Sequence, residues 1–223
     1  SCLMSQHFDA IIIGTGQAGP SLAARFADAG MTVAIIERHK FGGTCVNTGC
    51  IPTKTLVASA YAAQVARRGA EYGFAVSGDV RVDMKRVKAR KDKISGASNT
   101  GVEERLRGLK NCTVIQGHAR FQSSHSVTVN DDVLEAPKIF INVGGRASVP
   151  PINGIDDVPF LTNSSMMDVD YLPKHLVIVG DPSELAIVVA GFTTSPANEV
   201  QSARDQLSVN LLRRVARRKV TSV

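Results

Sequence analysis

The sequence predicts an α/β fold built on a parallel, doubly wound sheet. The prediction rests on an apolar run at residues 8–13, a glycine-rich turn, apolar positions at helical spacing up to Gly30, and a second apolar run at residues 32–36. Strand, helix and strand in this order give parallel strands, because the helix returns the chain to the same end of the sheet.

The chain has 223 residues, of which 43% are hydrophobic, with a formal net charge of +6. This length and composition suit one domain and part of another, and they exclude a wholly disordered chain. No stretch has the roughly 18 to 20 apolar residues that cross a bilayer, so we expect a soluble, cytoplasmic protein without a membrane partner. Basic clusters at residues 85–93 and 213–219 accompany no nucleic-acid-binding motif, and we interpret them as solvated helix faces.

After the second strand, residues 44–68 predict a long alanine-rich helical stretch. Residues 82–110 predict a helix or helix pair, interrupted at Ser95 and Gly96. The period then changes to two, which predicts a small β-meander followed by a buried strand at residues 138–143. The runs expected in the meander are 113–116, 119–122, 126–129 and 133–135.

A proline- and glycine-containing loop at residues 149–154 marks the expected domain boundary. Residues 1–150 form the first domain, and residues 151–223 form an incomplete second nucleotide-binding unit with a divergent basic tail. The second unit begins with a strand at residues 175–179 and a helix near Pro182.

The turn between the first strand and helix has the pattern G-x-G-x-x-G, formed by Gly14, Gly16 and Gly19. These glycines allow a tight turn, a close approach of a pyrophosphate and close packing of helix on strand. Glu37 lies 18 positions after Gly19, where a carboxylate can bind an unphosphorylated ribose. The pattern favours a Rossmann-like site for FAD or NAD, and the alternative is a glycine-rich turn in another kind of α/β protein.

Cys45 and Cys50 stand within the stretch GGTCVNTGCIPTK. Residues five apart on an ideal helix have Cα atoms roughly 8 to 9 Å apart, so a disulfide requires a distorted helix start. Gly49 and Pro52 permit that distortion. Helix N-termini lower thiol pKa values, which favours a redox pair. The alternatives are a zinc site, for which a second Cys/His pair is missing, and two unrelated buried thiols.

These motifs resemble the FAD-dependent pyridine nucleotide–disulfide oxidoreductases over residues 8–180, and most closely their mercuric-reductase-like branch. The resemblance implies that electrons pass from NAD(P)H through FAD to a Cys45–Cys50 disulfide and on to a sulfur-containing or metal-ion substrate. It also implies a homodimer, although the chain after residue 181 no longer matches the family's interface domain and looks truncated.

The resemblance assigns a role to each matching residue. Cys50 is the thiol beside the flavin, Cys45 is the interchange thiol that meets the substrate, and Lys54 approaches flavin N5. No metal-ligand set is implied. The residues expected to bind the cofactor are Gly14, Gly16, Gly19, Glu37, Arg38, Gly43, Thr44, Cys50, Lys54, His118, Ala119, Gly144, Gly145, Arg146 and Ser165.

A second glycine pattern is expected after the strand at 175–179, but its positions read Gly180, Pro182 and Leu185. Proline offers no N–H to a phosphate, and leucine blocks the close packing that a third glycine allows. We therefore expect no competent nicotinamide site here. The alternative function is a non-catalytic FAD-binding fragment or interaction module.

Overall fold

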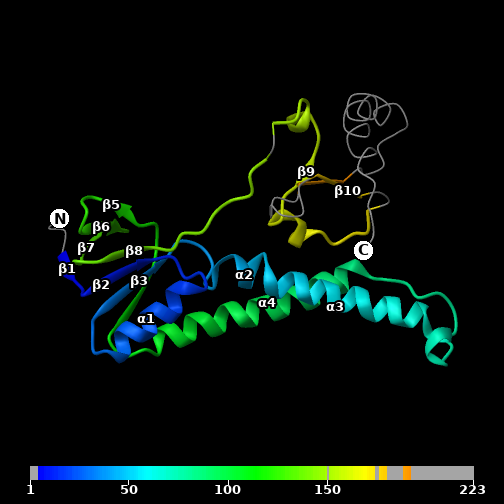
Figure 1. Cartoon of the computed structure of the whole chain (residues 1–223), viewed down its shortest axis with the longest axis horizontal. Coiled ribbons are helices and arrows are strands. Elements are labelled where there is room, and N and C mark those ends of the chain that lie inside the picture. The colour runs from blue at the N-terminus through cyan, green and yellow to red at the C-terminus, as the bar shows by residue number, and fades with distance from the viewer. Residues whose placement is uncertain (1–4, 150, 174–175, 180–187, 192–223) are drawn as a thin grey trace, which may run out of the picture. The chain divides into compact units, whose positions relative to one another are not determined.

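The fold is taken from a computed structural model, which describes residues 5–149, 151–173, 176–179 and 188–191 (Figure 1). The chain divides into two compact units, Ser1–Arg146 and Ala147–Val223, and each is described by itself. Among the described residues, no helix is both long and apolar enough to cross a bilayer.

The first unit is built on a parallel sheet with the strand order β4-β3-β2-β8, which confirms the predicted α/β class. Alternate residues of its central strands face opposite sides. Ala10, Ile12, Val33 and Ile35 pack toward the helices, and Ile11, Ala34 and Ile36 pack toward a smaller sheet. The strands are β2 (Ala10–Ile13), β3 (Val33–Glu37), β4 (Cys112–Gln116) and β8 (Ile139–Ile141).

Helices cover one face of this sheet. The long helices α3 and α4 lie side by side (Figure 1), and Arg90 of α4 donates a hydrogen bond to the Thr55 carbonyl of α3 at 3.1 Å. The helices are α1 (Ala18–Asp28), α2 (Gly43–Asn47), α3 (Cys50–Arg67) and α4 (Met84–Arg107), with a short 3-10 helix η1 (Gly69–Tyr72) after α3.

The predicted interruption at Ser95 and Gly96 is wrong, because α4 runs unbroken through both residues. Ser95 is buried, and a side chain at Gly96 would meet nothing within 4 Å. A glycine inside a helix costs only about 1 kcal/mol relative to alanine. The Asp83 side chain caps α4 by accepting the Arg86 N–H at 3.1 Å. The helix also packs against α1, α2, α3 and β4, and these contacts outweigh the cost of the glycine.

The other face of the parallel sheet is covered by a small sheet with the order β1-β7-β6-β5. Strands β5, β6 and β7 form the expected antiparallel meander, and β1 joins β7 in parallel. The run 113–116 was expected in the meander, but it belongs to the parallel sheet as β4. Its Val114 and Ile115 pack on opposite faces, so the strand is covered on both sides. The small sheet contains β1 (Ser5–His7), β5 (Arg120–Phe121), β6 (Ser126–Val129) and β7 (Asp132–Glu135).

The described part of the second unit contains an antiparallel sheet with the order β10-β11-β9. The strand expected at 175–179 is present as β10, and His175 lies outside the described residues, as do Gly180, Pro182, Leu185 and the basic tail. The incomplete second nucleotide-binding unit stays a prediction. The elements are η2 (Ile155–Asp157), β9 (Phe160–Leu161), η3 (Ser165–Asp168), β10 (Leu176–Val179) and β11 (Val188–Gly191).

Candidate functional site

The predicted turn joins the end of β2 to the start of α1. Gly14 has φ 103°, and a Cβ atom there would collide with the carbonyl oxygen of Asn142. A Cβ atom on Gly19 would collide with the carbonyl oxygen of Gly14. Only glycine therefore fits at the first and third positions of the motif.

The start of α1 is open to an anion. No side chain caps the helix at Gln17, and its first turn holds no acidic residue. Gly19 donates its N–H to the Gly16 carbonyl at 3.0 Å and Pro20 has no N–H. The attraction for an anion here comes from the positive end of the helix dipole and from the close backbone approach that the glycines allow. The turn therefore fits a pyrophosphate such as that of FAD.

Glu37 ends β3 beside this turn, as the sequence predicts. Its Oε2 accepts hydrogen bonds from the backbone N–H of Thr15 at 3.1 Å and from the Thr15 hydroxyl at 2.5 Å. Its Oε1 accepts the His39 N–H at 2.9 Å. A carboxylate has about four acceptor positions, so a ribose bound here would share Glu37 with Thr15.

The segment that carries the cysteines packs directly on the turn. The Thr15 hydroxyl accepts the Gly42 N–H at 3.2 Å, and Gln17 Nε2 donates to the Gly42 carbonyl at 3.4 Å. Gly43 has φ 62°, and a Cβ atom there would lie 2.7 Å from the Cα of Gly16. The turn and the cysteine segment therefore form one packed body.

The helix start around the cysteines is distorted, as the sequence predicts. Helix α2 ends at Asn47 and α3 begins at Cys50, so Cys45 and Cys50 lie on two successive helices. At the break, a Cβ atom on Gly49 would lie 3.0 Å from the Thr44 carbonyl oxygen. Pro52 falls in the first turn of α3, where its missing N–H costs nothing.

Both cysteines are free thiols in this structure, Cys45 half-buried and Cys50 exposed. A hydrogen bond with the Cys50 side chain raises the pKa of Cys45, and burial and the Cys50 charge act in the same direction. The backbone of Cys50 and the Lys54 ammonium lower the pKa of Cys45 by smaller amounts. The Cys50 side chain therefore favours the neutral thiol of Cys45, which is the opposite of the effect that a helix N-terminus alone has on a thiol.

Asparagine side chains brace this arrangement. Asn47 Nδ2 donates to the carbonyl oxygens of Phe41 at 2.8 Å and Gly43 at 2.9 Å. Asn99 of α4 donates to the same Phe41 oxygen at 2.7 Å. At the turn, Asn142 Nδ2 donates to the Gly14 carbonyl at 3.3 Å.

Thr15, Asn47, Asn99 and Asn142 were not among the residues predicted from sequence. Thr15 and Asn47 stand inside the recognised motifs, so their hydrogen-bonding side chains were a usable signal. Asn99 lies 52 positions from its partner Asn47, so only the packing of α4 on α2 identifies it.

The carboxyl ends of the parallel strands bring most of the predicted residues to one edge of the sheet. Gly14 follows β2, and His118 follows β4. Glu37 is the last residue of β3, and Arg38 follows it. The remaining predicted loop residues, Gly144, Gly145 and Arg146, follow β8 and are exposed. This edge is where ligands bind in open α/β sheets.

The other predicted residues are placed as follows. Thr44 is exposed on α2, and Lys54 is exposed on α3 one turn after Cys50. Ala119 is half-buried directly before β5. Ser165 belongs to the second unit, where its hydroxyl accepts the Thr162 N–H at 2.8 Å, and it is not part of the arrangement described for the first unit.

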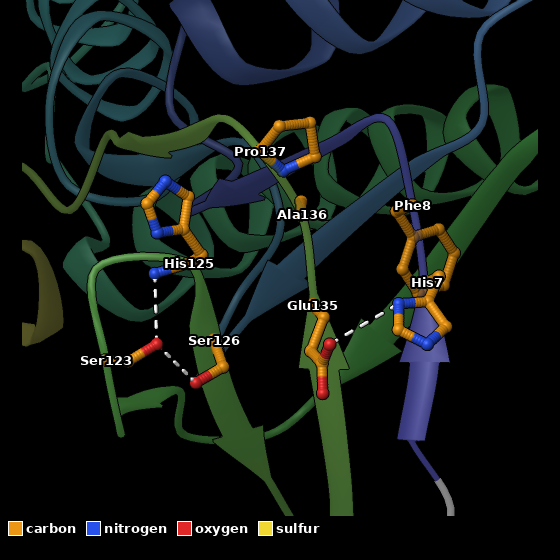
Figure 2. A pocket seen from close by; sticks show the side chains of 8 residues that line it. All are labelled: His7, Phe8, Ser123, His125, Ser126, Glu135, Ala136 and Pro137. Atoms are coloured by element: carbon orange, nitrogen blue, oxygen red, sulfur yellow. Dashed lines mark hydrogen bonds and ion pairs between the residues drawn. The ribbon is translucent and has the colours of Figure 1, made fainter.

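A separate hollow of about 560 Å³ opens on the small sheet (Figure 2). His7 Nδ1 lies 3.4 Å from a Glu135 carboxylate oxygen there, and the Ser123 and Ser126 hydroxyls are 2.8 Å apart. None of the predicted site residues lines it. Across the described residues, no three His, Cys, Asp or Glu side chains gather closely enough to hold a metal ion. The hollow is lined by His7, Phe8, Ser123, His125, Ser126, Glu135, Ala136 and Pro137.

Comparison with known proteins finds a family model and relatives that match this chain. The family model described as pyridine nucleotide-disulphide oxidoreductase matches residues 8–214. A dihydrolipoyl dehydrogenase of Acholeplasma laidlawii is 34% identical over 181 residues, which cover 79% of this chain and 54% of that protein. A mercuric reductase of Lysinibacillus sphaericus is 32% identical over 174 residues, which cover 78% of this chain and 32% of that protein.

A solved structure shows the same relationship. The Cu(II) complex of the HOCl-induced flavoprotein disulfide reductase RclA from Escherichia coli superposes with a TM-score of 0.60 at 33% sequence identity. The match covers 75% of this chain and 36% of that one. The chain therefore spans between about a third and about half of the length of these relatives.

Proposed function

Because the chain belongs to the pyridine nucleotide-disulphide oxidoreductase family, we propose that it is an FAD-dependent oxidoreductase with Cys45 and Cys50 as its redox pair. Electrons reach this pair through FAD and pass on to a sulfur-containing or metal-ion substrate, and NAD(P)H is the electron donor that the family uses. The observation that carries the proposal is the packing of the cysteine segment on the glycine turn through Gly42 and Gly43.

The residues at the carboxyl edge of the sheet are suited to hold FAD. The glycine turn and the positive end of the α1 dipole would hold the pyrophosphate, and the Glu37 carboxylate would accept hydroxyl groups of the adenosine ribose. His118 and Ala119 would contact the adenine, and Gly144, Gly145 and Arg146 would lie near the phosphates, as the family resemblance implies. When bound, FAD supplies the hydride and electron-transfer chemistry that side chains cannot perform.

The two cysteines differ in the way that a relay requires. Cys50 is exposed at the start of α3, which leaves its sulfur open to a bound cofactor, and Lys54 follows one turn later. Cys45 is the interchange thiol that reacts with the substrate. Two electrons and two protons convert the disulfide to two thiols, and the thiols return the electrons when the disulfide reforms.

The substrate class follows from sulfur chemistry and from the relatives. Thiolates attack disulfides, and they are soft ligands that bind thiophilic metal ions. Among the relatives are a mercuric reductase and a flavoprotein solved as its Cu(II) complex. We infer that the substrate is a disulfide or a thiophilic metal ion. We also infer that the active protein is a homodimer, as the family resemblance implies.

Reconstitution tests the proposal. The purified chain is mixed with FAD, freed of unbound cofactor, and titrated without oxygen with NADH and then NADPH. Retained flavin that is bleached by one of the two nucleotides supports the proposal. A folded chain that retains no flavin contradicts it.

A second candidate is a non-catalytic FAD-binding fragment or interaction module. The departure of Gly180, Pro182 and Leu185 from the glycine pattern of a nicotinamide site favours it. It predicts that the bound flavin stays oxidised with both nicotinamide nucleotides and is reduced by dithionite alone.

A further inference from the structure

We propose that Thr15 is a positioning residue whose hydroxyl couples the FAD-ribose carboxylate of Glu37 to the segment that carries the redox cysteines. The proposal rests on the proposed function for the identity of the ligand. The contacts themselves lie within the chain and hold without it.

Thr15 is fully buried, with an exposed fraction of 0%. Its hydroxyl donates to Glu37 Oε2 at 2.5 Å and accepts the Gly42 N–H at 3.2 Å. A hydroxyl is among the few side-chain groups that can donate and accept at once. One oxygen atom therefore joins the end of β3 to the residue that precedes α2.

Gly42 is the cap residue of α2, and Cys45 is the third residue of that helix. Gly42 is buried, so its N–H has no access to water if the Thr15 hydroxyl is removed. The donor to the Gly42 carbonyl, Gln17, also belongs to the turn. The backbone at the start of α2 therefore depends on side chains of the turn at both of its polar groups.

The Thr15 hydroxyl connects the ribose-binding carboxylate of Glu37 directly to the start of α2, which carries Cys45. A ribose hydroxyl that binds Glu37 adds to the hydrogen bonds that the carboxylate already accepts from Thr15. A shift of Thr15 in response moves the acceptor of the Gly42 N–H and with it the start of α2. Binding of a ribose at Glu37 thereby changes the reactivity of Cys45.

The test compares Thr15→Val with Thr15→Ser in the full chain. Valine has nearly the shape of threonine but no hydroxyl, whereas serine keeps the hydroxyl and loses only a methyl group. Thr32→Val is the matched control, because the Thr32 hydroxyl also donates to a carboxylate, that of Asp9 at 2.9 Å, but at the opposite end of the strands.

Two quantities are measured for each variant. The first is the dissociation constant for FAD, from flavin fluorescence. The second is the rate at which Cys45 reacts with a thiol reagent, with and without FAD, followed by mass mapping of the Cys45 peptide. Unfolding by urea shows whether each variant is folded.

Loss of the hydrogen bond from the Thr15 hydroxyl to the Glu37 carboxylate predicts that Thr15→Val weakens FAD binding roughly 10- to 100-fold. Without FAD, its Cys45 reacts roughly 5-fold faster than that of the native chain, because the start of α2 is loosened. Thr15→Ser and Thr32→Val stay close to the native values. Saturating FAD changes the Cys45 rate in the native and Thr15→Ser chains but not in Thr15→Val.

Native FAD affinity and native Cys45 reactivity in folded Thr15→Val overturn the inference, and so does a Thr15→Ser variant as impaired as Thr15→Val. If the native chain binds no FAD, the proposed function fails instead. The Cys45 rates of the cofactor-free variants then decide the inference alone, since an unchanged rate in Thr15→Val overturns it and a faster rate rescued by serine supports it.

Discussion

Asn99 of α4 donates a hydrogen bond from its Nδ2 to Oδ1 of Asn47 in α2 at 3.2 Å. Both side chains also donate to the carbonyl oxygen of Phe41, directly before the Gly42–Gly43 turn. The long helix α4 thereby holds the short helix that carries Cys45. A 5-residue helix is too short to be stable alone, so its position depends on such partners.

Replacement of Asn99 by alanine is expected to lower the free energy of unfolding by about 1 to 3 kcal/mol, because the Asn47 oxygen loses its donor. Cys45 should react faster with a thiol reagent, since α2 loses its tie to α4. Urea unfolding and Cys45 peptide mapping measure the two effects. Ser98→Ala is the control, because the Ser98 hydroxyl donates to the Ile94 carbonyl of its own helix. Equal effects in both variants would show that the hydrogen bonds of Asn99 do not hold α2 in place.

Gly43→Ala should disrupt the contact between the turn and the cysteine segment. Its φ of 62° disfavours alanine, and the added Cβ atom would lie 2.7 Å from the Cα of Gly16. We expect a loss of stability of about 2 kcal/mol or more and loss of bound FAD.

Gly96→Ala is the matched change at a position without such constraints. Gly96 lies inside α4 with nothing within 4 Å of the added atom, so alanine should stabilise the chain by about 0.5 to 1 kcal/mol. Thermal unfolding compares the two variants. A Gly43→Ala protein as stable as Gly96→Ala would show that the close packing is not required.

The pH dependence of Cys45 reactivity depends on the neighbouring Cys50 side chain. The hydrogen bond with the Cys50 side chain is the largest cause that raises the pKa of Cys45, so the Cys45 thiolate forms only above the pH at which an ordinary thiol ionises. Cys50→Ala removes that cause and the effect of the Cys50 charge. Burial, which raises the pKa of Cys45, remains, as do the Cys50 backbone and Lys54, which lower it. The alkylation profile of Cys45 is therefore expected to move to lower pH.

Cys112→Ala is the control for this measurement. Burial raises the pKa of Cys112, which begins β4 and is not among the groups that affect Cys45. The Cys45 profile should stay in place in this variant. A Cys50→Ala profile that stays in place, or moves to higher pH, would contradict the assigned cause.

The sequence was most informative where one residue type alone meets a local requirement. Gly14 and Gly19 are such positions, because any side chain there meets backbone atoms, and the break before Cys50 followed from helix geometry and Gly49. Glu37, His118 and Gly144 each stand at or after the end of a parallel strand, so the fold class alone predicts that they lie at one edge of the sheet.

The sequence was least informative where tertiary packing decides between alternatives. Gly96 looked like a helix breaker, but α4 runs through it and packs against α1, α2, α3 and β4. Residues 113–116 alternate as a meander strand does, and only the cover on both faces shows that they belong to the parallel sheet. The raised pKa of Cys45 depends on the neighbouring thiol, which propensity and helix-end arguments do not contain.

The most direct test of the central claim counts electrons. The FAD-loaded, oxidised chain is titrated without oxygen with dithionite, and flavin absorbance and free thiols are followed together. A flavin takes two electrons and a disulfide takes two more, so the account predicts four per native chain and two for Cys45→Ser. A native chain that stops at the two electrons of its flavin, with no gain of thiols at Cys45 and Cys50, would contradict the claim that these cysteines form the redox pair.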